Sequence, residues 1–278
     1  MINPQTISEQ LMYATVRIEA RDGDTITSTG SGFLYQENLG NDKHLPLVIT
    51  NKHVIDGNSS AVFHMHVSDG NGLPTGKFIP AIVDNLATCV IGHPDPSVDL
   101  CAILVGNIHA DATAKGISLF LKYLTSDLIY SDLQLSELSA VEDVLMVGYP
   151  IGLWDSANNF PIIRRGTTAS HPAVDFQGKS ITVIDAACFP GSSGSPVLVV
   201  NEGFYRNKSG TVVGDRAILL GVLASGPCMT ASGQVTIVDI PTKQAAIAST
   251  QIMIHLGNIV KAKEIVKLVS TVRAILNV

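Results

Sequence analysis

Aromatic and charged residues are both scarce in this 278-residue chain. Aromatic side chains make up 5% of the residues, with a single tryptophan, whereas hydrophobic residues together make up 46%. A core of this composition has to be built mainly from valine, isoleucine, leucine and alanine. Charged residues make up 15%, and the net charge of −6 comes without any basic cluster. This charge balance argues against binding to nucleic acid or to an anionic membrane surface.

Long apolar segments and a secretion signal are also missing. No segment reaches the ~18 apolar residues that a membrane-spanning helix requires. Residues 1–6 (MINPQT) lack the basic region and the apolar run of a signal peptide. We therefore expect a cytoplasmic protein, in which a reducing environment does not maintain disulfides. The four cysteines expected as free thiols are Cys89, Cys101, Cys188 and Cys228.

Sequence patterns favour strands through most of the chain. Alternating and β-branched runs, separated by turns such as residues 69–72 (DGNG), continue to about residue 105. Similar runs span about residues 141–258 and include a predicted hairpin with its tip at residues 205–210. An all-β unit of ~200–250 residues can form one domain, so we expect little beyond it except a helix near each end.

Three segments carry helical patterns. Residues 6–9 (TISE) form a capping box, which predicts a short helix running toward Tyr13. After Lys261, an apolar stripe at helical spacing predicts a C-terminal helix that packs on the β structure. The residues of this stripe are Ile265, Leu268, Val269, Val272 and Leu276. Helical spacing also occurs at residues 117–124, within residues 107–140, which we interpret as the connection between two halves.

A serine between glycines is the strongest candidate for a catalytic group. Residues 188–197 (CFPGSSGSPV) place Ser193 at a tight turn that leads into a strand. A serine hydroxyl near its free pKa reacts poorly, so a nucleophilic serine needs three kinds of partner. These are a base that takes its proton, an acid that orients the base, and backbone N–H groups that receive the oxyanion.

A base and an acid can be proposed from two upstream segments. In residues 47–55 (LVITNKHVI), His53 follows a β-branched run and so lies at a strand end, where an imidazole can face a cleft. Asp99 directly precedes another buried-looking strand. Asp95 is the alternative acid, but the prolines on both sides of it favour a loop cap. The chain order His, Asp, Ser is that of the chymotrypsin arrangement.

These three motifs resemble the catalytic motifs of trypsin-like serine peptidases. TNKHV and GSP are similar to the glutamyl-endopeptidase branch, whereas residues 185–187 (DAA) and 148–153 (GYPIGL) resemble the bacterial HtrA-type branch. Residues 30–34 (GSGFL) resemble the early strand found in both branches, so the resemblance runs from about residue 28 to the C-terminus. It implies an all-β, chymotrypsin-like fold of two six-stranded antiparallel β-barrels, with a short N-terminal helix and a C-terminal helix.

The resemblance also implies a division of the chain and a role for each site residue. Residues 1–140 would hold the first barrel and the connection, and residues 141–278 the second barrel, together forming one peptidase domain. Ser193 would attack, His53 would carry the proton and Asp99 would hold the histidine tautomer. The oxyanion hole would be made by the backbone N–H groups of Gly191 and Ser193. The chemistry needs no cofactor and no metal.

The resemblance further implies where an extended peptide or protein substrate would bind. Residues 223–226 (LASG) resemble the strand that pairs with substrate by β-augmentation. The substrate-binding residues implied in this way are Ala187, Cys188, Ala224, Ser225 and Gly226. None of them is acidic, which predicts a small or medium apolar residue before the cleaved bond. His171 is a further candidate for the pocket, and Cys188 and Cys228 both fall near it.

The chain departs from the family in the residue before the nucleophile. The family usually has aspartate or asparagine there, and this chain has Ser192. Activation by a buried N-terminal amine is therefore not expected, because Ser192 cannot provide the acid. The loop would be less rigid or would depend on a partner. Because an uncontrolled peptidase would be hazardous in the cytoplasm, we hypothesise latent activity released by an activating protein partner. We also expect none of the PDZ modules usual in the HtrA-type branch, because the 278 residues leave no room for them beside the peptidase domain.

Two alternatives remain beside this interpretation. The chain could be a catalytically weak, peptidase-like module that binds extended peptides or protein partners, and reaction with a serine-directed electrophile would distinguish the two. Separately, His64 and His66 form an H-x-H pair that would face one side of a strand and could bind metal. No third ligand is suggested by spacing, so we expect these histidines on a solvated strand instead.

Overall fold

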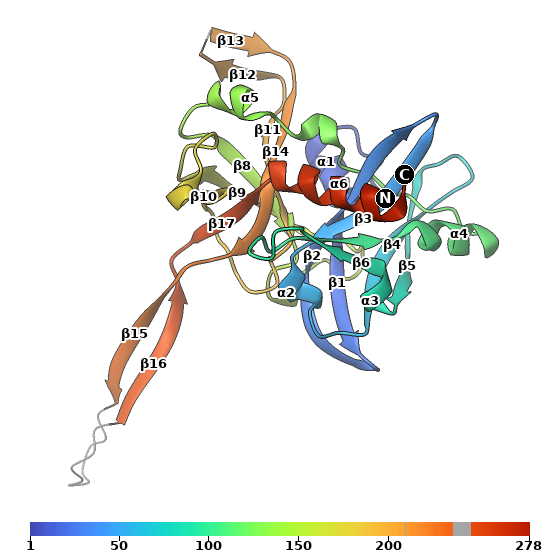
Figure 1. The fold of residues 1–278 in the computed structure, drawn as a ribbon, viewed down its shortest axis with the longest axis horizontal. Coiled ribbons are helices and arrows are strands. Elements are labelled where there is room, and N and C mark those ends of the chain that lie inside the picture. Colours follow the sequence, from blue (N-terminus) through green and yellow to red (C-terminus); the bar gives the residue numbers. More distant parts are fainter. Residues whose placement is uncertain (209, 236–245) are drawn as a thin grey trace.

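The first half of the chain forms a seven-stranded antiparallel sheet (Figure 1). The computed structural model describes residues 1–208, 210–235 and 246–278. The strands of this sheet are β1 (Thr15–Asp22), β2 (Thr25–Gly40), β3 (Lys43–Thr50), β4 (Ser60–Ser68), β5 (Pro74–Asp84), β6 (Val90–Gly92) and β7 (Cys101–Leu104). Their order across the sheet is β5-β4-β1-β2-β3-β7-β6.

The six-stranded first barrel is not confirmed, because this sheet has seven strands and its edges do not pair. Within the described residues, no ladder joins β5 to β6. The edge strand β6 is only three residues long and pairs with β7 alone. The connecting segment pairs with the sheet instead, through single bridges between Val67 and Leu119 and between Tyr35 and Leu124.

The second half contains a closed barrel of six strands, as predicted. The strands of the barrel are β8 (Asp143–Gly148), β9 (Ile162–Thr168), β10 (Ile181–Asp185), β11 (Pro196–Asn201), β14 (Arg216–Ser225) and β17 (Leu256–Lys261). They follow the order β10-β17-β14-β11-β8-β9, and β9 closes the ring onto β10. Ser193 lies in the turn that leads into β11.

Two hairpins extend from the barrel (Figure 1). β12 (Phe204–Asn207) and β13 (Gly210–Val213) pair in antiparallel register and confirm the hairpin predicted around residues 205–210. β15 (Cys228–Val235) and β16 (Ala246–Met253) form a second antiparallel pair, which projects as a long arm.

Both terminal helices occur where the sequence predicts them. In α1 (Ile7–Ala14) the Thr6 side chain accepts the Glu9 N–H at 3.3 Å, and the Glu9 carboxylate accepts the Thr6 N–H at 3.1 Å, so the capping box is complete. The C-terminal helix is α6 (Lys263–Leu276). The shorter helices are α2 (Lys52–Ile55), α3 (Leu86–Cys89), α4 (Gly106–Ala114), α5 (Asp132–Ser136), η1 (Ser126–Leu128), η2 (Pro150–Gly152) and η3 (Phe176–Gly178). In the described part of the chain, no helix has both the length and the apolar character needed to cross a membrane.

The helical prediction for residues 117–124 is wrong, because this segment is extended. The Phe120 N–H donates to the His66 carbonyl at 2.8 Å, and the Leu124 N–H donates to the Leu34 carbonyl at 3.0 Å. The apolar residues 117, 119, 121 and 124 fit a period of two nearly as well as a helical period, and short apolar runs do not separate the two. Pairing with the two sheet strands decides between them.

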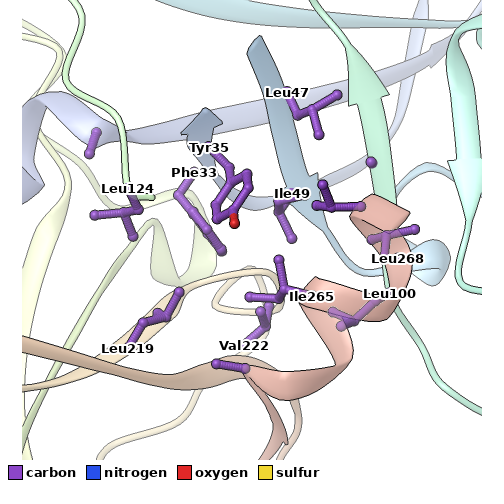
Figure 2. Packing of buried hydrophobic residues seen from close by; sticks show 14 of the residues in the cluster. Phe33, Tyr35, Leu47, Ile49, Leu100, Leu124, Leu219, Val222, Ile265 and Leu268 are labelled. Carbon is purple, nitrogen blue, oxygen red and sulfur yellow. The ribbon is translucent and has the colours of Figure 1, made fainter. Parts of the chain in front are cut away.

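One hydrophobic cluster joins the sheet, the barrel and α6 (Figure 2). Phe33 and Ile49 enter it from the sheet, Leu219 and Val222 from the barrel, and Leu268 from the helix. All five are 1% exposed or less. Because the same cluster takes side chains from both halves, it fixes the sheet and the barrel against each other. The site lies where these halves meet.

Candidate active site

The structure brings His53 and Asp99 together. His53 lies in α2, directly after β3, and Asp99 lies in the loop before β7. The two strands pair with Thr50 opposite Cys101, so the ends that carry the two side chains are neighbours. The His53 Nδ1 atom lies 2.5 Å from Asp99 Oδ2, and the His53 backbone N–H donates to Asp99 Oδ1 at 3.2 Å.

These hydrogen bonds keep Asp99 ionised. Burial alone would raise the pKa of Asp99, but the hydrogen bonds from the His53 ring and backbone and from the Lys52 backbone outweigh it and hold the pKa below its usual value. The buried Asn51 side chain fixes the loop by donating to the Asp99 carbonyl at 2.7 Å. An ionised carboxylate beside Nδ1 favours the tautomer with its proton on Nδ1, which leaves Nε2 of His53 as the basic atom.

Asp95 has a different environment. Its carboxylate accepts the Ser97 N–H at 2.9 Å and the Ser97 hydroxyl at 2.7 Å. These bonds lower the pKa of Asp95 and tie the carboxylate to its own loop. Asp99, and not Asp95, therefore contacts the histidine.

The turn around Ser193 depends on its two flanking glycines. Gly191 and Gly194 have φ angles of +83° and +86°, which side-chain-bearing residues rarely adopt. A Cβ at Gly194 would lie 1.8 Å from the Ser31 carbonyl oxygen and 2.5 Å from Thr50 Oγ1. The turn is therefore packed directly against β2 and against the end of β3, three positions before His53.

Ser31 connects the sheet to this turn, a role that was not predicted from the sequence. Its Oγ donates to the Gly191 carbonyl at 3.0 Å and accepts the Tyr149 N–H at 2.9 Å. Its backbone N–H donates to the Ser193 carbonyl at 2.8 Å, and its own carbonyl accepts a hydrogen bond from Thr50 Oγ1 at 2.7 Å. The small residues of the GSGFL motif were the only sequence signal for this close approach.

The peptide between Pro190 and Gly191 is oriented by Ile151. The Ile151 N–H donates to the Pro190 carbonyl at 2.6 Å, and the Pro190–Gly191 peptide bond is trans. Because the C=O and N–H of a trans peptide point in opposite directions, the Gly191 N–H points away from Ile151. Among the described residues, neither this N–H nor that of Ser193 has a hydrogen-bond partner.

The Ser193 hydroxyl also has no hydrogen-bond partner in the part of the chain that the structure describes, so it does not bond to His53 here. Catalytic hydrogen bonds are often long in unliganded structures and tighten only when substrate binds.

Comparison with known proteins agrees with this geometry. The chain matches the family model of the trypsin-like peptidase domain over residues 30–204, which is well over half of its length. The protein belongs to the trypsin-like peptidase family. No curated protein sequence matches it.

Solved structures similar to this trypsin-like peptidase include two bacterial proteins. One is a mutant, inactive form of Rv3671c from M. tuberculosis H37Rv, with 16% identity, 98% of this chain and 91% of that chain covered, and a TM-score of 0.48. The other is the serine endoprotease from Yersinia pestis, with 16% identity, 96% of this chain and 66% of that chain covered, and a TM-score of 0.49.

The predicted substrate-binding residues of the peptidase lie in two different environments. Cys188 is 2% exposed and packs in a hydrophobic cluster inside the barrel, where burial raises the pKa of its thiol to about 11. Ala187 is half-buried. Ala224 and Ser225 end β14, and Ser225 Oγ accepts the Asn258 amide at 3.2 Å. Gly226 follows them.

Cys188, Cys228 and His171 were also predicted to lie at or near this pocket. Cys188 is a free cysteine, and the side chain of Cys228 lies outside the described residues. His171 lines a cavity of about 670 Å³ together with Glu142 and Arg216, and none of the predicted catalytic or substrate-binding residues lines it.

A half-buried arginine, which the sequence did not predict at the site, contacts the nucleophile turn of the peptidase. Arg164 on β9 donates to Ser192 Oγ at 2.9 Å and to the Ala187 carbonyl. Ser192 is fully buried. Burial lowers the pKa of the Arg164 guanidinium, which nevertheless stays charged at neutral pH. Nothing in the sequence separates Arg164 from its neighbour Arg165 except the alternation of a strand.

The expected solvation of the H-x-H pair is wrong for His66. This side chain is 4% exposed, and its ring lies 4.8 Å from the Tyr13 ring and 5.4 Å from the Phe160 ring. His64 is half-buried. Within the described residues, no group of three or more His, Cys, Asp or Glu side chains could hold a metal ion.

Proposed function

We propose that this protein is a serine endopeptidase that hydrolyses peptide bonds through an acyl-enzyme. The observation that carries the proposal is the 2.5 Å contact between His53 Nδ1 and Asp99, in a chain that belongs to the trypsin-like peptidase family. Ser193 is the nucleophile because its turn packs against the end of β3, the strand that leads to His53.

In this mechanism His53 Nε2 takes the proton of Ser193 as the hydroxyl oxygen attacks the substrate carbonyl. The histidine then gives the proton to the leaving amine. Water next attacks the acyl-enzyme, and His53 takes the proton of the water and returns it to the Ser193 oxygen. Asp99 stays ionised and stabilises the imidazolium that forms in each step. Its lowered pKa supports this role.

The tetrahedral oxyanion would be stabilised by the backbone N–H groups of Gly191 and Ser193. Two observations support this assignment. The Ile151 N–H holds the Pro190 carbonyl on one side of the peptide, which turns the Gly191 N–H to the other. Both N–H groups also lack another acceptor among the described residues. Donors aimed at the developing charge are usually the largest single contribution to such catalysis.

The substrate would be an extended peptide or protein strand that pairs with the backbone of residues 224–226. The preference for a small or medium apolar residue before the cleaved bond, the cytoplasmic location and the activating partner stay predictions.

The alternative function is a peptidase-like module that binds peptides without cleaving them. The observation that favours it is the Ser193 hydroxyl, which has no hydrogen-bond partner among the described residues. This module would use the same backbone of residues 224–226 but would not activate the serine.

Labelling with a fluorophosphonate probe separates the two functions. In the expected reaction, Ser193 Oγ attacks phosphorus, fluoride leaves and His53 accepts the hydroxyl proton, so the intact mass increases by one phosphonyl group. Ser193→Ala and His53→Ala should abolish this reaction. Ser195→Ala is the matched control, because Ser195 lies in the same motif but its Oγ is buried without a partner in the described structure, and this variant should label like the wild type.

Labelling of Ser193→Ala at the wild-type rate would show that another residue reacts and would reject the triad. A folded wild type that does not label, yet binds peptides, would support the binding module instead.

A further inference from the structure

Arg164 contacts both ends of the loop 187–192, which contains Gly191 and leads directly into Ser193. The loop begins at Ala187, whose carbonyl accepts from one guanidinium nitrogen, and ends at Ser192, whose Oγ accepts from another at 2.9 Å. Gly191 lies between these anchors. A planar guanidinium has its donors in a fixed geometry, so two such bonds set the positions of both loop ends relative to β9.

The charge of Arg164 has no carboxylate partner in the described part of the chain. Its two acceptors are a carbonyl and a hydroxyl, and its Nε is buried without a partner there. Hydrogen bonds from a charged donor are about twice as strong as neutral ones, and Ser192 is fully buried, so water does not compete for its Oγ.

The neighbouring Arg165 is a natural contrast on the same strand. Its side chain is 72% exposed, lies on the opposite face of β9 and pairs with Asp143 at 2.6 Å. Surface ion pairs of this kind contribute little to stability. Of these two adjacent arginines, only Arg164 therefore contacts the loop.

We propose that Arg164 is a positioning residue that holds the loop in the conformation in which the Gly191 and Ser193 N–H groups can bind the oxyanion. The proposal rests on the proposed peptidase function. A half-buried cationic side chain from the barrel wall thus performs the bracing that an acid at the position of Ser192 would otherwise perform. The brace is part of the folded chain, so the loop does not need a newly freed N-terminal amine.

The test compares Arg164→Met, Arg164→Lys and the matched control Arg165→Met. Three quantities are measured on the full-length protein: the rate of phosphonylation by the fluorophosphonate probe, amide hydrogen exchange of residues 187–195, and the melting temperature. We expect Arg164→Met to slow phosphonylation roughly 10- to 100-fold, as for loss of charged hydrogen bonds in a buried site. Arg164→Lys should be intermediate, because an ammonium lacks the two-pronged geometry. Arg165→Met should behave like the wild type.

Two comparisons separate positioning from general folding. Exchange in Arg164→Met should increase in residues 187–195 and remain unchanged in β11 and β14. Added guanidinium ion should partly restore the phosphonylation rate of Arg164→Ala, which a general folding defect would not allow. If Arg164→Met does not fold, Ser192→Ala replaces it, because this variant removes one acceptor and leaves the arginine in place. Ser192→Ala should slow phosphonylation less than tenfold and should increase hydrogen exchange in the same loop.

The outcomes distinguish the two proposals. If Arg164→Met labels and exchanges at the rates of the wild type while Ser193→Ala does not label, the role of Arg164 is overturned and the peptidase function still holds. Labelling of Ser193→Ala at the wild-type rate would overturn the peptidase, whereas faster loop exchange in Arg164→Met would still support the brace.

Discussion

At the scale of single residues, the environment of His66 shows how burial changes what a histidine can do. Its ring lies among the aromatic rings of Tyr13 and Phe160, and its Nδ1 has no hydrogen-bond partner in the described structure. Burial lowers the pKa of His66 from 6.5 to about 4. The side chain is therefore neutral at physiological pH and serves packing, although its sequence motif would also suit a metal ligand.

The lowered pKa predicts how stability depends on pH. Between pH 6.5 and 4 the unfolded chain binds a proton at His66 that the folded chain does not, so this contribution is complete above pH 6.5 and is lost as the pH falls. The contribution of His66 to the free energy of unfolding should decrease by about 3 kcal/mol over this interval. Urea unfolding at pH 7, 5.5 and 4.5 measures it. His66→Phe should weaken the pH dependence and exposed His44→Gln should not; equal slopes in all three proteins would contradict the assignment.

The sequence was most informative about the single residues that form the site. His53, Asp99 and Ser193 each stand in a local motif with a chemical reason, and the structure places the first two in contact. Arg164 and Ser31 could not be predicted in this way. Each acts on a loop that is distant in sequence, and the strand patterns around them report only which face is buried.

At the scale of elements, β2 is the strand that holds the nucleophile turn to the sheet. Ser31 is fully buried and makes three hydrogen bonds across this boundary, two to the turn and one to Tyr149 at the end of β8. Glycine at position 148 on β8 allows this close approach, because a Cβ there would lie 2.7 Å from Ser31 Oγ. The sequence identified the segment around Ser31 as a strand but could not show what it contacts.

Removing the Ser31 hydroxyl should therefore affect both stability and catalysis. Ser31→Ala leaves the buried Tyr149 N–H and the Gly191 carbonyl without this partner, which should cost about 1–3 kcal/mol of unfolding free energy. Phosphonylation of Ser193 should also slow, because the turn loses an anchor. Thr29→Ala, at an exposed position nearer the start of the same strand, is the control and should change neither quantity. A stability loss with an unchanged phosphonylation rate would mean that the hydroxyl serves only folding.

The element-scale predictions from sequence succeeded where a pattern was long or capped. The capping box of α1, the stripe of α6 and the hairpin of β12 and β13 were all predicted. Residues 117–124 were not, because a short apolar run takes its conformation from its neighbours. Closure of the first sheet into a barrel was likewise undetermined by local sequence, since it depends on which edge strands can reach each other.

At the scale of the whole molecule, the candidate site requires that the sheet and the barrel stay together. His53 and Asp99 come from the sheet, and Ser193 comes from the barrel. The shared hydrophobic cluster fixes this arrangement, and α6 adds a fully buried Leu268 to it (Figure 2). A second buried contact links α6 to the sheet half: the Glu264 carboxylate on α6 lies 3.1 Å from His93 Nε2, on the loop that leads to Asp99.

Truncating Leu268 should therefore destabilise the whole molecule in one step. Leu268→Ala removes a fully buried side chain and should lower the free energy of unfolding by about 2–5 kcal/mol, whereas Val266→Ala, on the exposed side of the same helix, should have little effect. Thermal unfolding is followed by far-ultraviolet circular dichroism and by fluorescence of Trp154, the single tryptophan. Because the cluster belongs to both halves, the two signals should change at one temperature, and labelling of Ser193 should disappear at that temperature too. Two separate transitions in Leu268→Ala would instead show that the sheet and the barrel are stable independently, and that α6 holds together a site whose halves fold alone.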